Sequence, residues 1–277
     1  MTGRGSVCAA VAAGAAIAVM VGCAAALPSH RPEQPAPAAA PGDAGRVPEL
    51  LRDASAEYAR RPDLAAVRRA QALYLRAAAV ETSGVAPLLG AVEASTWLAD
   101  HEPDARARGT AIDQSIEAAR RCVERAPDAP ACDYGLALAL GLQARERPST
   151  ALDGLKLMVA KLRRAEKADP RLDRAGPSRV LALVLAKAPG WPLGPGDPES
   201  AVGEAKKAVS LFPQHAPNQL ALSEALLATG AADDAHAAAE KGLALARAAS
   251  ADPDAADWIR DGERLRIADP PSQPTTP

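Results

Sequence analysis

The sequence predicts an all-α protein, a superhelical solenoid in which about four to five antiparallel helix pairs stack in series. Composition is the first observation: the chain is 48% hydrophobic, yet it has only three Trp, three Tyr and one Phe, so its apolar content is mainly Ala, Leu and Val. Alanine has the highest helix propensity and lets helices approach closely. The second observation is periodicity, because apolar residues recur at helical spacing from Val47 onward and are regularly interrupted by Pro, Gly and Asp.

These interruptions divide the predicted domain, residues 47–268, into a series of short helices. The predicted helices span residues 47–60, 63–80, 84–100, 105–126, 130–146, 148–169, 177–188, 198–211, 216–229, 231–248 and 254–267. Pro127 and Pro170 each follow one of them closely, where a residue without an N–H cannot continue a helix. No segment has the alternation of a strand. The alternative to a solenoid is a generic bundle of Ala-rich helices.

One stretch near the C-terminus has a repeat pattern. It contains two large residues, a turn glycine, a small residue in the next helix and a final small–large pair, which are Leu222, Leu226, Gly230, Ala235, Gly242 and Leu243. This pattern resembles a tetratricopeptide repeat, in which small residues lie where two helices cross and large ones fill the groove between pairs. The preceding unit fits in part, and earlier units are irregular in length.

The first residues, 1–22, have the layout of a secretory signal peptide, with a short polar start and an apolar run over 7–21. The run closes with Met20, then Gly22 and Cys23, which resembles the bacterial lipobox. The resemblance implies that Cys23 becomes the new N-terminus and carries lipid on its sulfur and amine, although Met20 departs from the usual Leu. An uncleaved membrane anchor or plain secretion is the alternative, because the run could be stretched to the roughly 18–20 residues of a membrane span.

Residues 23–46 form the predicted tether behind the lipid. Frequent proline disfavours helix and favours extended polyproline II, so about 20 residues at ~3.1 Å each would reach roughly 60 Å from the membrane. Residues 269–277 are predicted to be a disordered tail. The residue that follows Cys23 is Ala24, so the acidic residue that would act as a retention signal at this position is missing. We therefore expect an exported protein, lipid-anchored on the periplasmic face of the outer membrane if the host has two membranes.

A Pro/Gly-rich loop separates the predicted helices 177–188 and 198–211, where the repeat would need only a short turn. The loop carries Trp191, and Asp197 is suited to cap the following helix. Long ordered loops on rigid scaffolds often carry function. The alternative is that Trp191 fills the groove between two helix pairs, which is compatible with a functional role.

The end of this loop resembles a specific lipoprotein family, the T component associated with tripartite ATP-independent periplasmic (TRAP) transporters. The residues that carry the resemblance, beside the lipobox, are Pro192, Gly194, Gly196, Asp197 and Ala201, with Tyr134-Gly135 opening an earlier helix. The resemblance spans about 130–245, and its motifs are short. It implies a trimer of superhelical subunits that docks a solute-binding protein and passes hydrophobic ligands. The loop residues and Tyr134 are therefore the predicted binding residues.

Two cysteines remain in the predicted domain. Cys122 lies in the last turn of one predicted helix and Cys132 in the first turn of the next. In an exported protein, two cysteines so placed can form a disulfide, which would stabilise the fold by roughly 2–3 kcal/mol. A pair of free buried thiols is the alternative.

Motifs for catalysis, metal or cofactor binding are missing from the sequence. The four histidines are scattered, without a partner at ligand spacing. Gly194-Pro-Gly196 lacks the lysine and preceding strand of a phosphate-binding loop, and Ser178 lacks the second glycine of a nucleophile elbow. We predict no enzyme and no cofactor. A net charge of −2 without a concentrated basic face also argues against a nucleic-acid partner.

The sequence is compatible with three functions. The first is a protein-interaction module in the cell envelope, with a solute-binding protein as a possible partner, and a curved helical solenoid offers a groove for such a partner. The second is a carrier for a small hydrophobic ligand. The third is a scaffold for envelope, outer-membrane or pilus assembly. In all three functions the protein contacts the membrane through its N-terminal lipid, and copies of the chain can assemble into a homo-oligomer.

Overall fold

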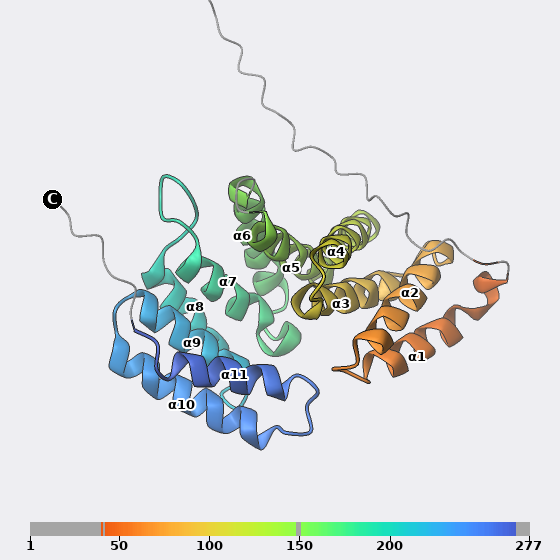
Figure 1. Cartoon of the computed structure of the whole chain (residues 1–277). Helices are drawn as coiled ribbons and strands as arrows, with labels where there is room; N and C mark the ends of the chain where they lie inside the picture. The colour runs from red at the N-terminus through yellow and green to blue at the C-terminus, as the bar shows by residue number, and fades with distance from the viewer. Residues whose placement is uncertain (1–39, 41, 148–150, 270–277) are drawn as a thin grey trace, which may run out of the picture. The chain divides into compact units, whose positions relative to one another are not determined.

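The computed structural model describes residues 40, 42–147 and 151–269, which all belong to one compact unit, Pro32–Pro277. The helices of these residues are η1 (Asp43–Arg46), α1 (Val47–Tyr58), α2 (Leu64–Val80), α3 (Ala86–His101), α4 (Ala105–Arg125), α5 (Pro130–Glu146), α6 (Ala151–Ala168), η3 (Leu172–Arg174), α7 (Gly176–Lys187), α8 (Pro198–Leu211), α9 (Ala216–Ala228), α10 (Ala232–Ala248) and α11 (Ala255–Leu265). Figure 1 labels the α-helices. The predicted signal peptide, Cys23, nearly all of the tether and residues 270–277 lie outside the described residues.

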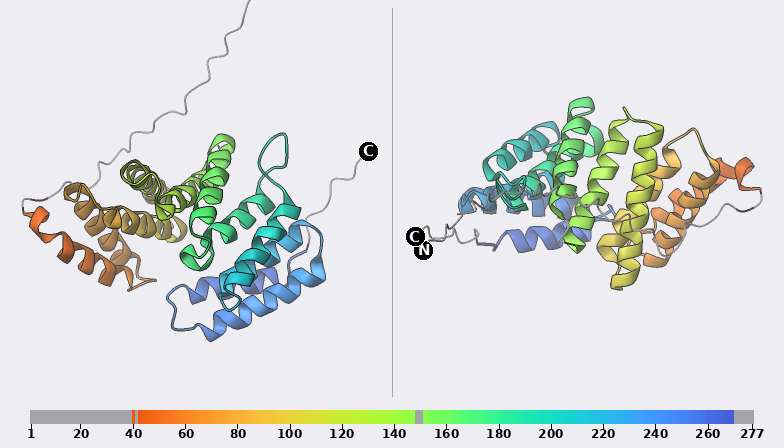
Figure 2. Two further views of the ribbon diagram at one scale, coloured as in Figure 1. Left: turned by 180° about the vertical axis from the view of Figure 1, so that it is seen from behind. Right: turned by 90° about the horizontal axis from the view of Figure 1, so that it is seen from above.

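The predicted all-α solenoid is confirmed. Consecutive helices pack as pairs, α1 with α2, α3 with α4, α5 with α6, α7 with α8 and α9 with α10, and α11 follows the last pair (Figure 1). Some odd-numbered helices of successive pairs also touch one another: α3 touches α5, and α7 touches α9, so these helices stack side by side (Figure 2). Each described helix end lies within two residues of its prediction, apart from the start of α6, where residues 148–150 are not described.

Local sequence signals explain where the helices begin. Aspartates at the N-cap accept hydrogen bonds from backbone N–H groups of the first turn in α2, α4 and α8. In six helices a proline occupies the first turn, where its missing N–H costs nothing. These prolines are Pro48, Pro87, Pro130, Pro177, Pro198 and Pro217.

Small residues set the distance between paired helices. Gly242 of α10 lies so close to α9 that a β-carbon there would be 2.6 Å from Leu220 Cδ2. Ala235, earlier in α10, is completely buried, and Gly230 between the two helices has φ +83°, a left-handed conformation that favours glycine. The repeat pattern predicted around these residues therefore corresponds to a real crossing of two helices.

A disulfide joins neighbouring pairs. Cys122 near the end of α4 and Cys132 at the start of α5 are bonded, with their α-carbons 5.3 Å apart, and both side chains are buried. The bond links the second helix of one pair to the first helix of the next. It therefore holds two consecutive pairs together at the connection Ala126–Ala129, where the chain makes a tight turn.

The two ends of the solenoid also make contact. Arg61, between α1 and α2, pairs with Asp254 at the start of α11, with Nε 3.1 Å from Oδ1. His101 at the end of α3 contacts Asp257 of α11, with Nε2 2.7 Å from Oδ2. Figure 1 shows α11 reaching toward the α1–α2 connection. Repeat units in a solenoid normally contact only their neighbours, so these contacts add long-range constraints that local stacking lacks.

Ordered structure begins before the predicted domain boundary. Asp43, within the predicted tether, lies in η1 and is buried, and its Oδ1 accepts a 2.7 Å hydrogen bond from Arg76 Nη2 of α2. The Arg76 bond lowers the pKa of Asp43, because a hydrogen-bonded guanidinium stabilises the carboxylate.

Among the described residues, no helix has the length and apolar character needed to cross a bilayer.

Two glycine substitutions test the close helix packing. A β-carbon on Gly90 of α3 would lie 2.7 Å from Tyr74 Cζ, in the buried interface with α2. We expect Gly90→Ala to lower the free energy of unfolding by about 1–3 kcal/mol, because the overpacked ring has to move. Gly203→Ala in α8, which has no neighbour within 4 Å, should instead raise it by about 0.5–1 kcal/mol. Urea unfolding followed by circular dichroism measures both, and equal effects would contradict the packing argument.

Candidate functional site

The loop between α7 and α8 is closed by its own backbone hydrogen bonds. Leu193 N and Gly194 N both donate to Gly190 O, at 3.0 and 3.1 Å, and Gly196 N donates to Pro189 O at 2.8 Å. Three of the eight residues in 189–196 are prolines, which have no N–H to satisfy. The loop is therefore a defined structure in which most backbone donors are either bonded or absent.

Two of the predicted loop residues are glycines because a side chain does not fit. A β-carbon on Gly194 would lie 2.5 Å from Pro189 O, and one on Gly196 would lie 2.8 Å from the same oxygen and closer still to Ala188 O. Both obstacles are backbone atoms, which cannot swing aside. The glycines therefore serve the shape of the loop, and their role in any binding is to hold the loop tip in place.

Asp197 fixes the end of the loop. Its Oδ1 accepts a 3.0 Å hydrogen bond from Ser200 N, so it caps α8 as predicted, and its Oδ2 accepts from Ser200 Oγ at 2.5 Å. These bonds lower the pKa of Asp197, because they favour the charged carboxylate. Asp197 N donates to Leu185 O at 2.8 Å, which ties the loop to the last turns of α7.

The tip of the loop is apolar and open to solvent. Trp191 is 89% exposed and Leu193 is 66% exposed. The peptide bond from Trp191 to Pro192 is cis. Because Trp191 is so exposed, it does not fill the groove between two helix pairs, and the alternative that it does so is wrong. The loop that carries it projects beyond the helices (Figure 2).

Tyr134, the other predicted binding residue, lies elsewhere. It is 8% exposed, and its hydroxyl donates a 2.7 Å hydrogen bond to Asp173 Oδ2, just before α7 begins. The loop follows the other end of α7, and a helix of 12 residues is about 18 Å long. The structure therefore places Tyr134 and the loop at opposite ends of α7, as two separate features.

Tyr134 contacts a turn that the sequence did not reveal. Asp173, Arg174 and Ala175 have φ angles of 46°, 51° and 65°, three consecutive left-handed residues without a glycine among them. Each such residue costs on the order of 1–3 kcal/mol and persists only where its surroundings over-determine it. The next residue, Gly176, leaves no room for a β-carbon, which would lie 2.5 Å from Tyr134 Oη.

A polar network holds this turn. Arg179 Nη2 donates to Asp173 Oδ2 at 2.7 Å, and Arg179 Nη1 donates to Asn218 Oδ1 at 3.0 Å. Asn218 is fully buried and donates in turn to Arg174 O at 3.2 Å. Burial raises the pKa of Tyr134, so its hydroxyl keeps its proton and acts as a donor. The network therefore joins α5, α7 and α9 around the turn.

His215, at the start of α9, completes the environment of the turn. Burial lowers its pKa to about 4, and the charges of Arg179 and Arg174 act in the same direction. Arg174 Nη1 lies 3.3 Å from His215 Nδ1, and a guanidinium can only donate, so Nδ1 is the acceptor and the ring is neutral.

No three His, Cys, Asp or Glu side chains are grouped to hold a metal ion in the part of the chain that the structure describes.

These features define the class of the protein as a helical solenoid of tetratricopeptide-like pairs with one rigid apolar loop. A solved structure with this fold is a thermophilic TPR (tetratricopeptide repeat) protein from Thermus thermophilus, which superposes with a TM-score of 0.59 at 21% sequence identity. The match covers 80% of this chain and 100% of that protein. At this identity the likeness establishes the fold.

Sequence comparisons add nothing to this assignment. No family model matches the chain, and no curated protein is significantly similar to it.

The neutral state of His215 predicts a pH dependence of stability. The folded protein holds His215 at a pKa of about 4, below the ordinary value of 6.5, so the unfolded chain binds a proton first as the pH falls. The stability contributed by neutral His215 is complete above pH 6.5 and declines between pH 6.5 and 4. We expect the unfolding free energies of wild type and His215→Gln to converge over this range in urea titrations. Parallel curves would contradict a histidine that the folded protein keeps neutral.

Proposed function

We propose that this chain is an exported lipoprotein whose helical domain is a non-enzymatic protein-interaction module. The lipobox-like segment ending at Cys23 supports export and lipidation, and the tetratricopeptide-like fold supports a role in binding proteins. In a host with two membranes, the lipid would hold the domain at the periplasmic face of the outer membrane. The absence of catalytic sequence motifs supports a binding role over an enzymatic one.

The observation that carries this proposal is the exposure of Trp191. An exposed tryptophan leaves a large apolar surface in water, and tryptophan is among the residues that contribute most to binding energy in protein interfaces. The loop that presents it is already ordered by its hydrogen bonds and glycines, so docking requires little loss of conformational freedom. Trp191 and Leu193 together are a preformed apolar contact for a partner protein.

The partner we propose is a solute-binding protein of the TRAP type. The support is the likeness of Pro192, Gly194, Gly196 and Asp197 to the loop of the TRAP T-component lipoproteins. In this role the domain passes a small hydrophobic ligand to or from its partner, and a homo-oligomer is the expected assembly. A scaffold for envelope, outer-membrane or pilus assembly would use the same exposed loop with a different partner.

Removal of the tryptophan side chain tests this use of the loop. We expect Trp191→Ala to weaken partner binding by about 30-fold or more, because interface tryptophans commonly contribute about 2 kcal/mol or more. Helicity by circular dichroism should not change, since the side chain is 89% exposed. Ile267→Ala is the matched control, because it truncates another exposed apolar side chain, 74% exposed, beyond α11.

The readout is mild crosslinking in cells, then detergent extraction and mass spectrometry of the proteins that co-purify. Recovery of a solute-binding protein by wild type and Ile267→Ala, but not by Trp191→Ala, supports the TRAP role. Recovery of secretin, pilus or outer-membrane assembly subunits would contradict it and support the scaffold role. Equal recovery by all three proteins would show that the loop is not the docking site.

Lipidation is tested separately. We expect Cys23→Ser to move the protein from the membrane fraction to the soluble periplasmic fraction or to leave it as unprocessed precursor, because the thioether to lipid cannot form. Cys8→Ser, which changes a cysteine within the predicted signal peptide, should leave the membrane fraction unchanged. Cell fractionation with mass spectrometry of the N-terminus checks both variants. A wild-type chain in the membrane fraction that still carries residues 1–22 would instead indicate an uncleaved anchor.

A further inference from the structure

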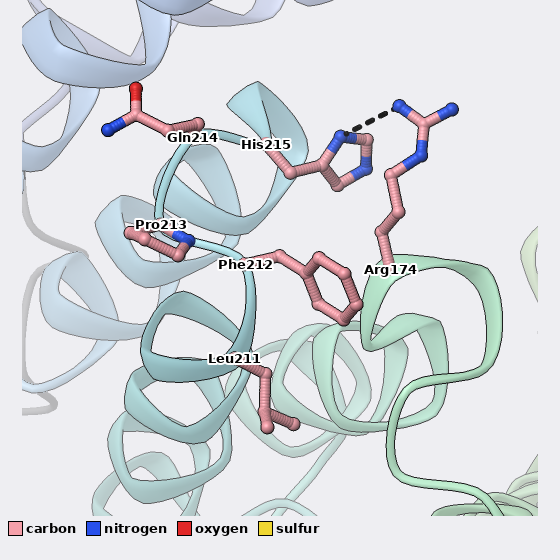
Figure 3. A pocket seen from close by; sticks show the side chains of 6 residues that line it. All are labelled: Arg174, Leu211, Phe212, Pro213, Gln214 and His215. Carbon is pink, nitrogen blue, oxygen red and sulfur yellow. Dashed lines mark hydrogen bonds between the residues drawn. The ribbon is translucent and has the colours of Figure 1, made fainter.

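A pocket lies where α8 meets α9, against the left-handed turn. Its volume is about 290 Å³, and its lining residues are Arg174, Leu211, Phe212, Pro213, Gln214 and His215 (Figure 3). This pocket is at the end of α8, whereas the Trp191 loop is at its start, about 20 Å away along a helix of 14 residues. It is therefore separate from the proposed docking loop.

The pocket presents an arginine with spare hydrogen-bond capacity. Arg174 uses Nη1 for the bond to His215, and among the described residues no carboxylate pairs with its guanidinium. The nearest acidic side chain in sequence, Asp173, is already bonded to Tyr134 and Arg179. The positive charge of Arg174 is thus available to a ligand. Figure 3 shows its guanidinium facing His215, with the ring of Phe212 beside them.

The other side of the pocket is apolar and aromatic. Leu211, Phe212 and Pro213 provide it, and a second guanidinium, that of Arg171, lies over the Phe212 ring with Cζ 4.6 Å from the ring centroid. Neutral His215 adds no charge of its own. Trp258 of α11 meets the His215 ring edge to face, with the two centroids 5.7 Å apart. The pocket therefore combines a cationic wall with an apolar one.

The strained turn explains why Arg174 faces this pocket. Its carbonyl is bonded by buried Asn218, and the residue before it is bonded by Tyr134 and Arg179, so the backbone of the turn is held on two sides. A left-handed conformation at three successive non-glycine residues has a cost, and strain of this kind clusters at ligand sites. The backbone is fixed, while Arg174 itself remains exposed and open to a ligand.

We propose that this pocket binds a carboxylate that carries an apolar group, either the C-terminal residue of a peptide or a free amphipathic acid. The planar fork of Arg174 matches a carboxylate, with which arginine forms paired charge-assisted hydrogen bonds. Phe212 and Leu211 contact the apolar group. A phosphate fits less well, because half of the lining offers it no hydrogen bond. The proposal does not depend on the docking role of the Trp191 loop.

The test uses the indole N–H signals of the full chain, whose only tryptophans are Trp97, Trp191 and Trp258. The probes are N-acetyl-leucine, its amide N-acetyl-leucinamide, and an Ala-Ala-Ala-Leu peptide with a free or an amidated C-terminus. We expect the two acids to shift the Trp258 signal saturably in ¹H–¹⁵N spectra and to leave the Trp191 signal unchanged. Trp258→Phe assigns the signal. The amides should bind about tenfold more weakly or worse, because they lack the charge that Arg174 recognises.

Variants locate the site. Arg174→Gln should weaken binding of the acids by about tenfold or more, with unchanged helicity, because its side chain is exposed and pairs with no carboxylate of the described residues. Arg52→Gln, which removes the same charge from α1, should bind like wild type. Tighter binding of the peptide identifies a protein C-terminus as the ligand, and tighter binding of free N-acetyl-leucine identifies a small acid. Equal binding of acids and amides, inorganic phosphate shifting Trp258 as well as the acids do, or full affinity in Arg174→Gln would overturn the proposal.

Discussion

At Gly90 the backbone of α3 lies against the ring of Tyr74 on α2, and at Gly242 the backbone of α10 lies against Leu220 on α9. Neither position has room for a β-carbon, and fully buried alanines such as Ala235 extend the same close packing. Neighbouring helices, both within a pair and between pairs, are therefore held at a short, well-defined distance. That distance sets how far apart in space the helix ends lie, and hence where the connections between helices emerge.

The connections at the two ends of α7 have different physical origins. The loop that begins after α7 is rigid for local reasons, since its prolines, its glycines and its backbone hydrogen bonds all lie within a few residues of one another. The turn before α7 is rigid for non-local reasons, because Asp173 is held by Tyr134 from α5 and by a chain of bonds that reaches Asn218 in α9. One connection presents an apolar tip to solvent. The other holds an arginine beside a pocket.

The contact between the ends of the solenoid changes how the fold responds to perturbation. Arg61 is 12% exposed where it pairs with Asp254, so removing one partner would leave a largely desolvated charge. The His101 imidazole stacks on Trp97, with ring centroids 3.9 Å apart, and reaches Asp257 from the same helix face. These contacts couple α11 to α1, α2 and α3. The two ends of the solenoid are thus linked directly as well as through the pairs between them.

The sequence by itself determined the helices, their caps and the order of the pairs. These features depend on residues that act only on their near neighbours in sequence. Examples are the proline in the first turn and the aspartate at the N-cap of α8, and the left-handed Gly230 between α9 and α10. It also singled out the loop with Trp191, and the shape of that loop follows from its own residues. Only the tertiary structure decided that Trp191 is exposed, that Tyr134 is buried apart from the loop, and that residues 173–175 are left-handed. The reason is that a left-handed alanine contradicts local propensity, and it is stabilised here by groups that lie tens of residues away along the chain.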